Sequence, residues 1–141
     1  MKFTLLDTNH YSALTDSSAL GEKIRGKAVD ADAELFTSII TVQKVSQGWF
    51  AWINGRPPGL EQVHGYAEFQ HNLEAFSRIT VLPFDDGAAW HFTELKQQRL
   101  RVGTMDLKIA AICLAHDAML LTRNRVDFEK VPNLKIENRL D

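Results

Sequence analysis

The chain has 141 residues, a formal net charge of -2 at pH 7 and a hydrophobic content of 45%. These values are typical of a globular domain and argue against a nucleic-acid binder that depends on a basic tail. We expect one domain spanning residues 1–141, because a chain of this length can bury most of its apolar side chains in one core. No apolar run approaches the roughly 18 residues that span a bilayer, and the N-terminus turns polar too early for a signal peptide. We therefore expect a cytoplasmic protein.

In chain order, we expect a strand at 3–7 and a helix at 16–26, then a strand at 34–40 and a helix that ends before the segment NGRPPG. A helix at 60–76 and a strand at 79–84 follow. The last part of the chain is expected to form helices at 86–100 and 103–116 and strands at 118–122 and 134–138. Short apolar runs that alternate with helices predict right-handed βαβ connections. The expected fold is α/β, with three layers: a mostly parallel central sheet and helices on both faces.

Two of the expected helices are rich in apolar residues. In the helix at 60–76, an apolar stripe at helical spacing predicts packing against the core; the stripe consists of Leu60, Val63, Tyr66, Phe69, Leu73 and Phe76. The preceding helix is apolar on more than one side, through Trp49, Phe50, Trp52 and Ile53. Core packing accounts for one of its sides, and the other is a candidate partner surface.

Cysteine and histidine do not indicate a metal site. Cys113 is the only cysteine, which excludes an intrachain disulfide and a cysteine-based zinc site, so we expect a buried thiol. The five histidines show no pair at metal-binding spacing, and we interpret them as surface residues; they are His10, His64, His71, His91 and His116.

Three aspartates stand where strands end or helices begin. Asp7 ends the first strand, Asp106 lies in the first turn of its helix, and Asp127 follows the fourth strand. The carboxyl ends of parallel strands share one edge of a sheet, so we expect these carboxylates to lie close together. Such oxygen ligands suit Mg²⁺ or Mn²⁺, which clamp phosphate oxygens and activate water, and this indicates phosphodiester chemistry. Each aspartate alone is equally explained as a cap or turn residue, although Thr104 is better placed than Asp106 to cap its helix.

Two segments carry a family resemblance. The segments LLDTN (5–9) and GTMDLKIAAICLAHDAMLLTRNRVDF (103–128) resemble the PIN-domain family, particularly the VapC-type toxins of bacterial toxin-antitoxin pairs. The resemblance covers essentially the whole chain and implies an RNA-hydrolysing enzyme that depends on Mg²⁺ or Mn²⁺. It matches Asp7, Asp106 and Asp127 to the family's catalytic and metal-binding acids. It also implies a cognate antitoxin and a homodimer.

One family position differs. The family carries T-x-x-E after the second strand, whereas residues 41–44 here read TVQK, so that Lys44 takes the place of a metal-site glutamate. Residues 35–60 contain no Asp or Glu; Gln43 is not an acid, and Glu94 on a later helix is more simply a surface residue. We predict that Lys44 stabilises the metal-free acids, competes with the metal and lowers activity. Two alternatives remain: Lys44 extends into solvent and leaves one ligand vacant, or its amine contacts the scissile phosphate.

Further polar residues surround the expected site. Thr8, Asn9, Thr104 and Asn124 are candidates to orient the acids or bind substrate, and turn or capping roles explain them nearly as well. Basic residues suffice for a local groove along an RNA backbone; they are Lys96, Arg99, Arg101, Lys108, Arg123 and Arg125. Arg123 and Arg125 flank Asn124 and are the first candidates for phosphate contact. Two functions therefore stay open: a VapC-like ribonuclease with lowered activity, or a catalytically impaired PIN-fold module that binds RNA or an antitoxin.

Overall fold

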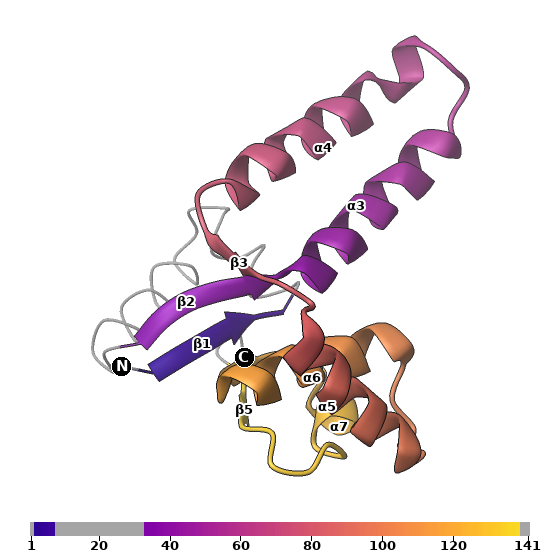
Figure 1. The fold of residues 1–141 in the computed structure, drawn as a ribbon. Helices are drawn as coiled ribbons and strands as arrows, with labels where there is room; N and C mark the ends of the chain where they lie inside the picture. The colour runs from indigo at the N-terminus through magenta and orange to yellow at the C-terminus, as the bar shows by residue number, and fades with distance from the viewer. Residues whose placement is uncertain (1, 8–32, 139–141) are drawn as a thin grey trace.

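The computed structural model describes residues 2–7 and 33–138 (Figure 1). The helix expected at 16–26 and the candidates Thr8 and Asn9 lie outside the described residues. The described elements are β1 (Lys2–Leu6), β2 (Ala33–Ser38), α3 (Ile39–Asn54), the 3₁₀ helix η1 (Leu60–Gln62), α4 (Val63–Phe76), β3 (Thr80–Leu82), α5 (Asp86–Gln97), α6 (Thr104–His116), β4 (Met119–Leu121), α7 (Arg125–Phe128) and β5 (Ile136–Glu137).

The described strands form one parallel sheet in the order β3-β2-β1-β4-β5. From the central strand β1 the chain moves outward to β2 and β3 on one side, and β4 and β5 lie on the other. The strand order therefore changes direction between β1 and β4, which is where parallel sheets open a crevice at their carboxyl ends. Asp7 directly follows β1 and stands at this point. The predicted parallel α/β sheet is confirmed.

Successive side chains of a strand point to opposite faces of the sheet. In this sheet, side chains on both faces pack against helices. Leu5 and Leu120 pack with residues of α5 and α6 in the larger core cluster. Leu6 and Leu121 pack on the other face with Phe76, at the end of α4, and with residues from the start of α3. Helices on both faces were predicted, and this arrangement confirms them.

The helices α3 and α4 form a hairpin that extends away from the sheet (Figure 1). Most of the apolar stripe at 60–76 therefore has no core to enter, and the prediction that it packs in the core is wrong. Its exposed members are Leu60, Val63, Tyr66 and Leu73. Phe69 instead contacts Phe50 of α3, with ring centroids 5.0 Å apart. Only Phe76, where the hairpin returns to the sheet, is buried among these residues.

Several element boundaries differ from the sequence prediction, and two of these differences bear on the site. The strand expected at 34–40 ends at Ser38, whose hydroxyl accepts a hydrogen bond from the Thr41 backbone N–H at 3.1 Å and begins α3. Thr104 is already the first helical residue of α6, so the capping role expected for it is wrong; Gly103 precedes the helix without a side-chain cap. None of the helices in the described part of the chain combines the length and apolar character needed to cross a bilayer.

Candidate active site

Asp7 is held at the carboxyl ends of the adjacent strands β1 and β4. Its carboxyl oxygen Oδ2 accepts a hydrogen bond of 2.9 Å from the Thr122 hydroxyl, and its backbone N–H donates to the Leu121 carbonyl at 3.0 Å. Asp7 is only 9% exposed. A carboxylate buried to this degree needs polar partners to offset its lost hydration, and Thr122 supplies one. Thr122 was not among the predicted site residues, although a polar residue that ends an apolar strand is a usable signal.

Lys44 contacts Asp106. The Lys44 Nζ lies 3.2 Å from Asp106 Oδ1, and the two side chains are 32% and 19% exposed. Lys44 stands in the second turn of α3, and Asp106 lies in the first turn of α6, where the helix dipole favours a negative charge. The alternative in which Lys44 extends into solvent is therefore wrong, because its ammonium group is paired with an acid of the site.

Asn124 connects the remaining acids. Its Nδ2 lies 3.0 Å from Asp127 Oδ2 and 3.4 Å from Asp106 Oδ2 and donates to both. Lys130 binds the other oxygen of Asp127 at 3.3 Å and donates to the Arg101 carbonyl at 3.1 Å. Lys44, Asp106, Asn124, Asp127 and Lys130 thus form one continuous set of contacts, which we call the paired-acid network.

The paired-acid network stabilises the ionised form of Asp127. The hydrogen bond from Asn124 is the main cause that lowers the pKa of Asp127 below its ordinary value, and the contact with Lys130 lowers it further. The carboxylate form of Asp127 is therefore favoured. The network is also tied to Asp7, because the Asn124 backbone N–H donates to the Thr122 hydroxyl at 3.0 Å. Asp7, Asp106 and Asp127 thus share one edge of the sheet, linked through Thr122 and Asn124.

Residues 4–134 match the profile of the PIN domain. The chain belongs to the PIN-domain family. Its fold resembles that of a VapBC2 structure from Rickettsia felis solved with a promoter DNA fragment, with a TM-score of 0.71 and 23% identity over 96% of this chain and 98% of that chain. A DNA-bound VapBC structure from Salmonella typhimurium gives a TM-score of 0.68 and 25% identity over 99% of this chain and 98% of that one.

Curated relatives of this PIN domain are similar over part of their length. Ribonuclease VapC2 of Rickettsia felis is 36% identical over 74 residues, which cover 49% of this chain and 55% of the relative. Ribonuclease VapC of Rickettsia bellii is 33% identical over 64 residues, 43% of this chain and 48% of the relative. The chain thus spans about half the length of the curated relatives it matches.

The acids of this PIN domain do not form a ready-made metal site. Both oxygens of Asp106 and both of Asp127 already accept hydrogen bonds. Across residues 2–7 and 33–138, no group of three or more His, Cys, Asp or Glu side chains is placed to hold a metal ion. The carboxylate oxygens are the correct donor type for Mg²⁺ or Mn²⁺, but Lys44 occupies the space beside Asp106. As placed, these residues would hold a divalent ion only after Lys44 moved away from Asp106.

The other predicted residues lie at the rim or away from it. Gln43 and Glu94 are exposed and make no hydrogen bond or ion pair with the described acids, so neither replaces the missing glutamate in this arrangement. Thr104 is exposed at the start of α6. Arg123 and Arg125 are exposed beside Asn124, and the Arg125 guanidinium pairs with Glu129 at 3.4 Å. Arg125 is therefore partly neutralised by a neighbouring acid.

Proposed function

We propose that this PIN-domain chain is a VapC-type ribonuclease, the toxin component of a toxin-antitoxin pair, whose activity on RNA phosphodiester bonds is lowered by Lys44. The similarity to chains named Ribonuclease VapC supports the substrate class. The observation that supports a lowered activity is the ion pair of 3.2 Å between Lys44 and Asp106, which places a cation at the position of a family carboxylate.

The acids have distinct roles in this proposal. Asp7, Asp106 and Asp127 are the catalytic set, and the resemblance assigns them to Mg²⁺ or Mn²⁺. Thr122 holds Asp7 in position, and Asn124 sets the separation of Asp106 and Asp127. Around them, we assign substrate contact or support to Thr8, Asn9, Thr104, Arg123 and Arg125.

Lys44 opposes metal binding in two ways. It removes one oxygen ligand, and it exchanges a negative charge for a positive one beside Asp106. At about 4 Å, opposite unit charges attract by around 4 kcal/mol at an effective dielectric constant of ~20, before the cost of desolvation. Solvent screening reduces this value, because both side chains are partly exposed. A divalent ion must still displace the Lys44 ammonium from Asp106 before it can bind there.

RNA cleavage with added Mg²⁺ or Mn²⁺ tests the proposal. We expect slow cleavage by the natural chain, cleavage faster by about tenfold or more in Lys44→Glu, equivalent to at least ~1.4 kcal/mol of barrier, and none in Asp7→Asn. Lys135→Glu is the matched control, because Lys135 pairs with Asp117 at the opposite end of the sheet. Rapid cleavage by the natural chain that Asp7→Asn abolishes contradicts the lowering by Lys44. Absence of cleavage in both the natural chain and Lys44→Glu contradicts a ribonuclease.

A binding module is the second candidate function. It is favoured by the paired-acid network, in which the oxygens of Asp106 and Asp127 are already satisfied without metal. In that case the chain retains RNA or an antitoxin without cutting. Calorimetric titration with Mn²⁺ separates the two: heat of binding that Asp106→Asn removes supports the ribonuclease, and its absence in the natural chain and in Lys44→Glu supports the binding module.

The proposed toxin has protein partners in the cytoplasm. Exposed apolar side chains of the α3–α4 hairpin support an antitoxin and a homodimer as partners, because monomers seldom expose so many large apolar groups together; these side chains are Phe50, Leu60, Val63, Tyr66 and Leu73. The matched VapBC structures support the antitoxin in particular. Light scattering of the chain alone measures the homodimer directly.

A further inference from the structure

The lysines of this chain fall into two groups. Among those whose side chains the structure describes, Lys44, Lys130 and Lys135 each pair with an aspartate at 3.2–3.3 Å. Lys96 and Lys108 do not: no described carboxylate lies within ion-pair distance of either. Their charges are therefore not neutralised by the described part of the chain and are available to an anionic ligand.

Lys96 and Lys108 instead lie over a pair of aromatic rings. Lys108 Nζ is 6.0 Å from the Phe84 ring centroid and 5.9 Å from that of Phe92, and Lys96 Nζ is 5.8 Å from the Phe92 centroid. The two rings contact each other edge to face, with centroids 6.1 Å apart. Both rings are partly exposed. We call these four residues the lysine-phenylalanine surface.

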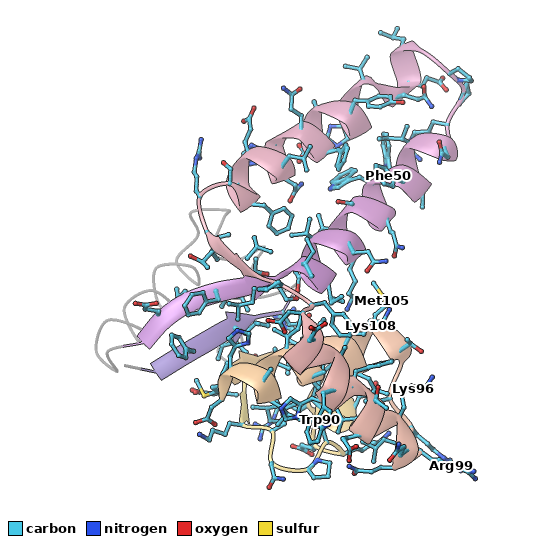
Figure 2. The ribbon with its side chains drawn as sticks, viewed as in Figure 1. Phe50, Trp90, Lys96, Arg99, Met105 and Lys108 are labelled. Atoms are coloured by element: carbon cyan, nitrogen blue, oxygen red, sulfur yellow. The ribbon has the colours of Figure 1, made fainter. Side chains whose placement is uncertain are left out.

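This surface lies near the candidate active site, on the side of α6 that faces α5. Phe84 follows the carboxyl end of β3, at the sheet edge where Asp7 follows β1, because the five described strands are parallel. Lys108 lies two residues after Asp106 in α6, close to it along the chain but on a different side of the helix. In Figure 2, Lys108, Lys96 and Arg99 follow one another along the side of the molecule formed by α5 and α6. A polymer that passes the acids can reach this surface by crossing the first turns of α6.

We propose that the lysine-phenylalanine surface binds single-stranded RNA beside the candidate active site; the proposal rests on the ribonuclease function proposed above. The ammonium groups of Lys96 and Lys108 contact backbone phosphates, and the exposed parts of Phe84 and Phe92 contact unpaired bases. This combination of cations and aromatic rings binds single strands with little sequence preference, since every base has an aromatic face. A double-stranded RNA offers its phosphates but not its base faces, and it binds more weakly here.

Fluorescence anisotropy with a short labelled single-stranded RNA tests this surface. EDTA in the buffer removes divalent ions, so that binding is measured apart from cleavage. We expect Lys96→Gln/Lys108→Gln to bind about tenfold more weakly than the natural chain. The slope of log affinity against log salt falls by about 0.7 for each phosphate of a single strand that the protein no longer neutralises. Lys135→Gln, which removes a paired lysine at the other end of the sheet, leaves both values unchanged.

The aromatic pair gives a second measurement. Phe84→Leu keeps an apolar side chain but removes the ring, so we expect weaker binding of single-stranded RNA with an unchanged salt slope. The melting temperature of each variant shows whether it is folded. If Phe84→Leu is not folded, the double lysine variant decides the proposal by itself, because Lys96 is exposed, Lys108 is partly exposed, and neither has an ion pair in the described residues to lose.

The outcomes separate this inference from the proposed function. Equal affinity and equal salt slope in the natural chain and the double lysine variant overturn the surface, as does natural-chain RNA binding too weak to detect in EDTA. Either result leaves the cleavage assay to decide the ribonuclease. Weakened binding in the double lysine variant, with no cleavage by the natural chain or by Lys44→Glu, upholds the surface and rejects the ribonuclease. If this surface binds a protein instead of RNA, the double lysine variant keeps the RNA affinity of the natural chain. That result also rejects the proposed RNA-binding surface.

Discussion

Asn124 is the side chain that holds Asp106 and Asp127 at their observed separation. One amide nitrogen donates to both carboxylates, which would otherwise repel each other at this distance. Lys44 and Lys130 occupy the outer oxygens of the same acids. The carboxylates of Asp106 and Asp127 are thus stabilised by two ammonium groups and one amide, all of which are side chains of this chain.

Replacement of Asn124 tests this network through the pKa of Asp127. Asn124→Ala removes the main cause that lowers this pKa, so we expect the value to rise toward its ordinary range. Because the pKa is lowered on folding, its stabilising effect is full at neutral pH and is lost as pH falls through the folded pKa. The variant should therefore have a smaller acid-dependent loss of stability from this group. Carboxyl ¹³C shifts of Asp127 against pH measure the change.

Asn72→Ala is the matched control, because the Asn72 amide donates to the Glu68 carbonyl within α4 and not to the site. A pKa of Asp127 that stays equally low in Asn124→Ala and Asn72→Ala would show that Asn124 does not stabilise the carboxylate.

At the scale of elements, the α3–α4 hairpin depends on contacts between its own helices. The His64 ring of α4 lies edge to face with Trp49 and Trp52 of α3, at centroid distances of 6.1 and 5.5 Å, and the Arg56 guanidinium stacks over Trp52 at 3.5 Å. Gly65 is buried against this group. The two helices approach closely at Gly65 because it has no side chain.

Alanine substitutions at two glycines of the hairpin should have opposite effects on the free energy of unfolding. A Cβ on Gly65 would lie 2.5 Å from Trp52 Cε3 and 2.6 Å from Ile53 Cγ1, so Gly65→Ala should separate the helices and cost about 1–3 kcal/mol of unfolding free energy. Gly48 in α3 has no atom within 4 Å of such a Cβ, and Gly48→Ala should stabilise by up to about 1 kcal/mol. Calorimetric melting temperatures compare them. A melting temperature that rises in Gly65→Ala as in Gly48→Ala would exclude the close contact.

At the scale of the whole molecule, α6 is the helix around which the larger core forms. Five consecutive residues of this helix, from Ile109 to Cys113, have 0% exposed surface. A helix that is apolar on all sides is typical of a core position, and it brings Asp106 to the sheet edge as a rigid unit. The candidate active site therefore shares its support with the core.

Cys113 gives a measurement of the integrity of this core. Burial raises the pKa of its thiol far above the ordinary range, and the negative charge of Asp7 raises it further. Because the thiolate is the reactive form, the native chain should react very slowly with a disulfide reagent, even at pH values where an exposed cysteine ionises. Reaction should become fast when urea unfolds the chain. Rapid native labelling that accelerates near pH 8.5 would contradict a buried thiol.

The order of the described strands and longer helices, the parallel sheet and the position of Asp7 and Asp106 at its carboxyl edge could be predicted from the sequence, whereas the short helix α7 was not predicted. Hydrophobic periodicity and helix signals are local, so they can be read from neighbouring residues. The resemblance to the family's T-x-x-E motif identified Lys44 as the unusual residue, and the absence of acids from residues 35–60 showed that no substitute lies on that helix. The roles of Asp7, Asp106 and Asp127 in catalysis stay a prediction.

Where these side chains make their contacts depends on how distant parts of the chain pack together. Lys44 and Asp106 are 62 positions apart, and Thr122 and Asp7 are 115 apart, so no local pattern indicates that they meet. The exposure of Leu60, Val63 and Tyr66 was likewise not readable from their helical spacing. Periodicity shows which side of a helix is apolar, but burial depends on whether another element covers that side, and this is fixed when the chain packs.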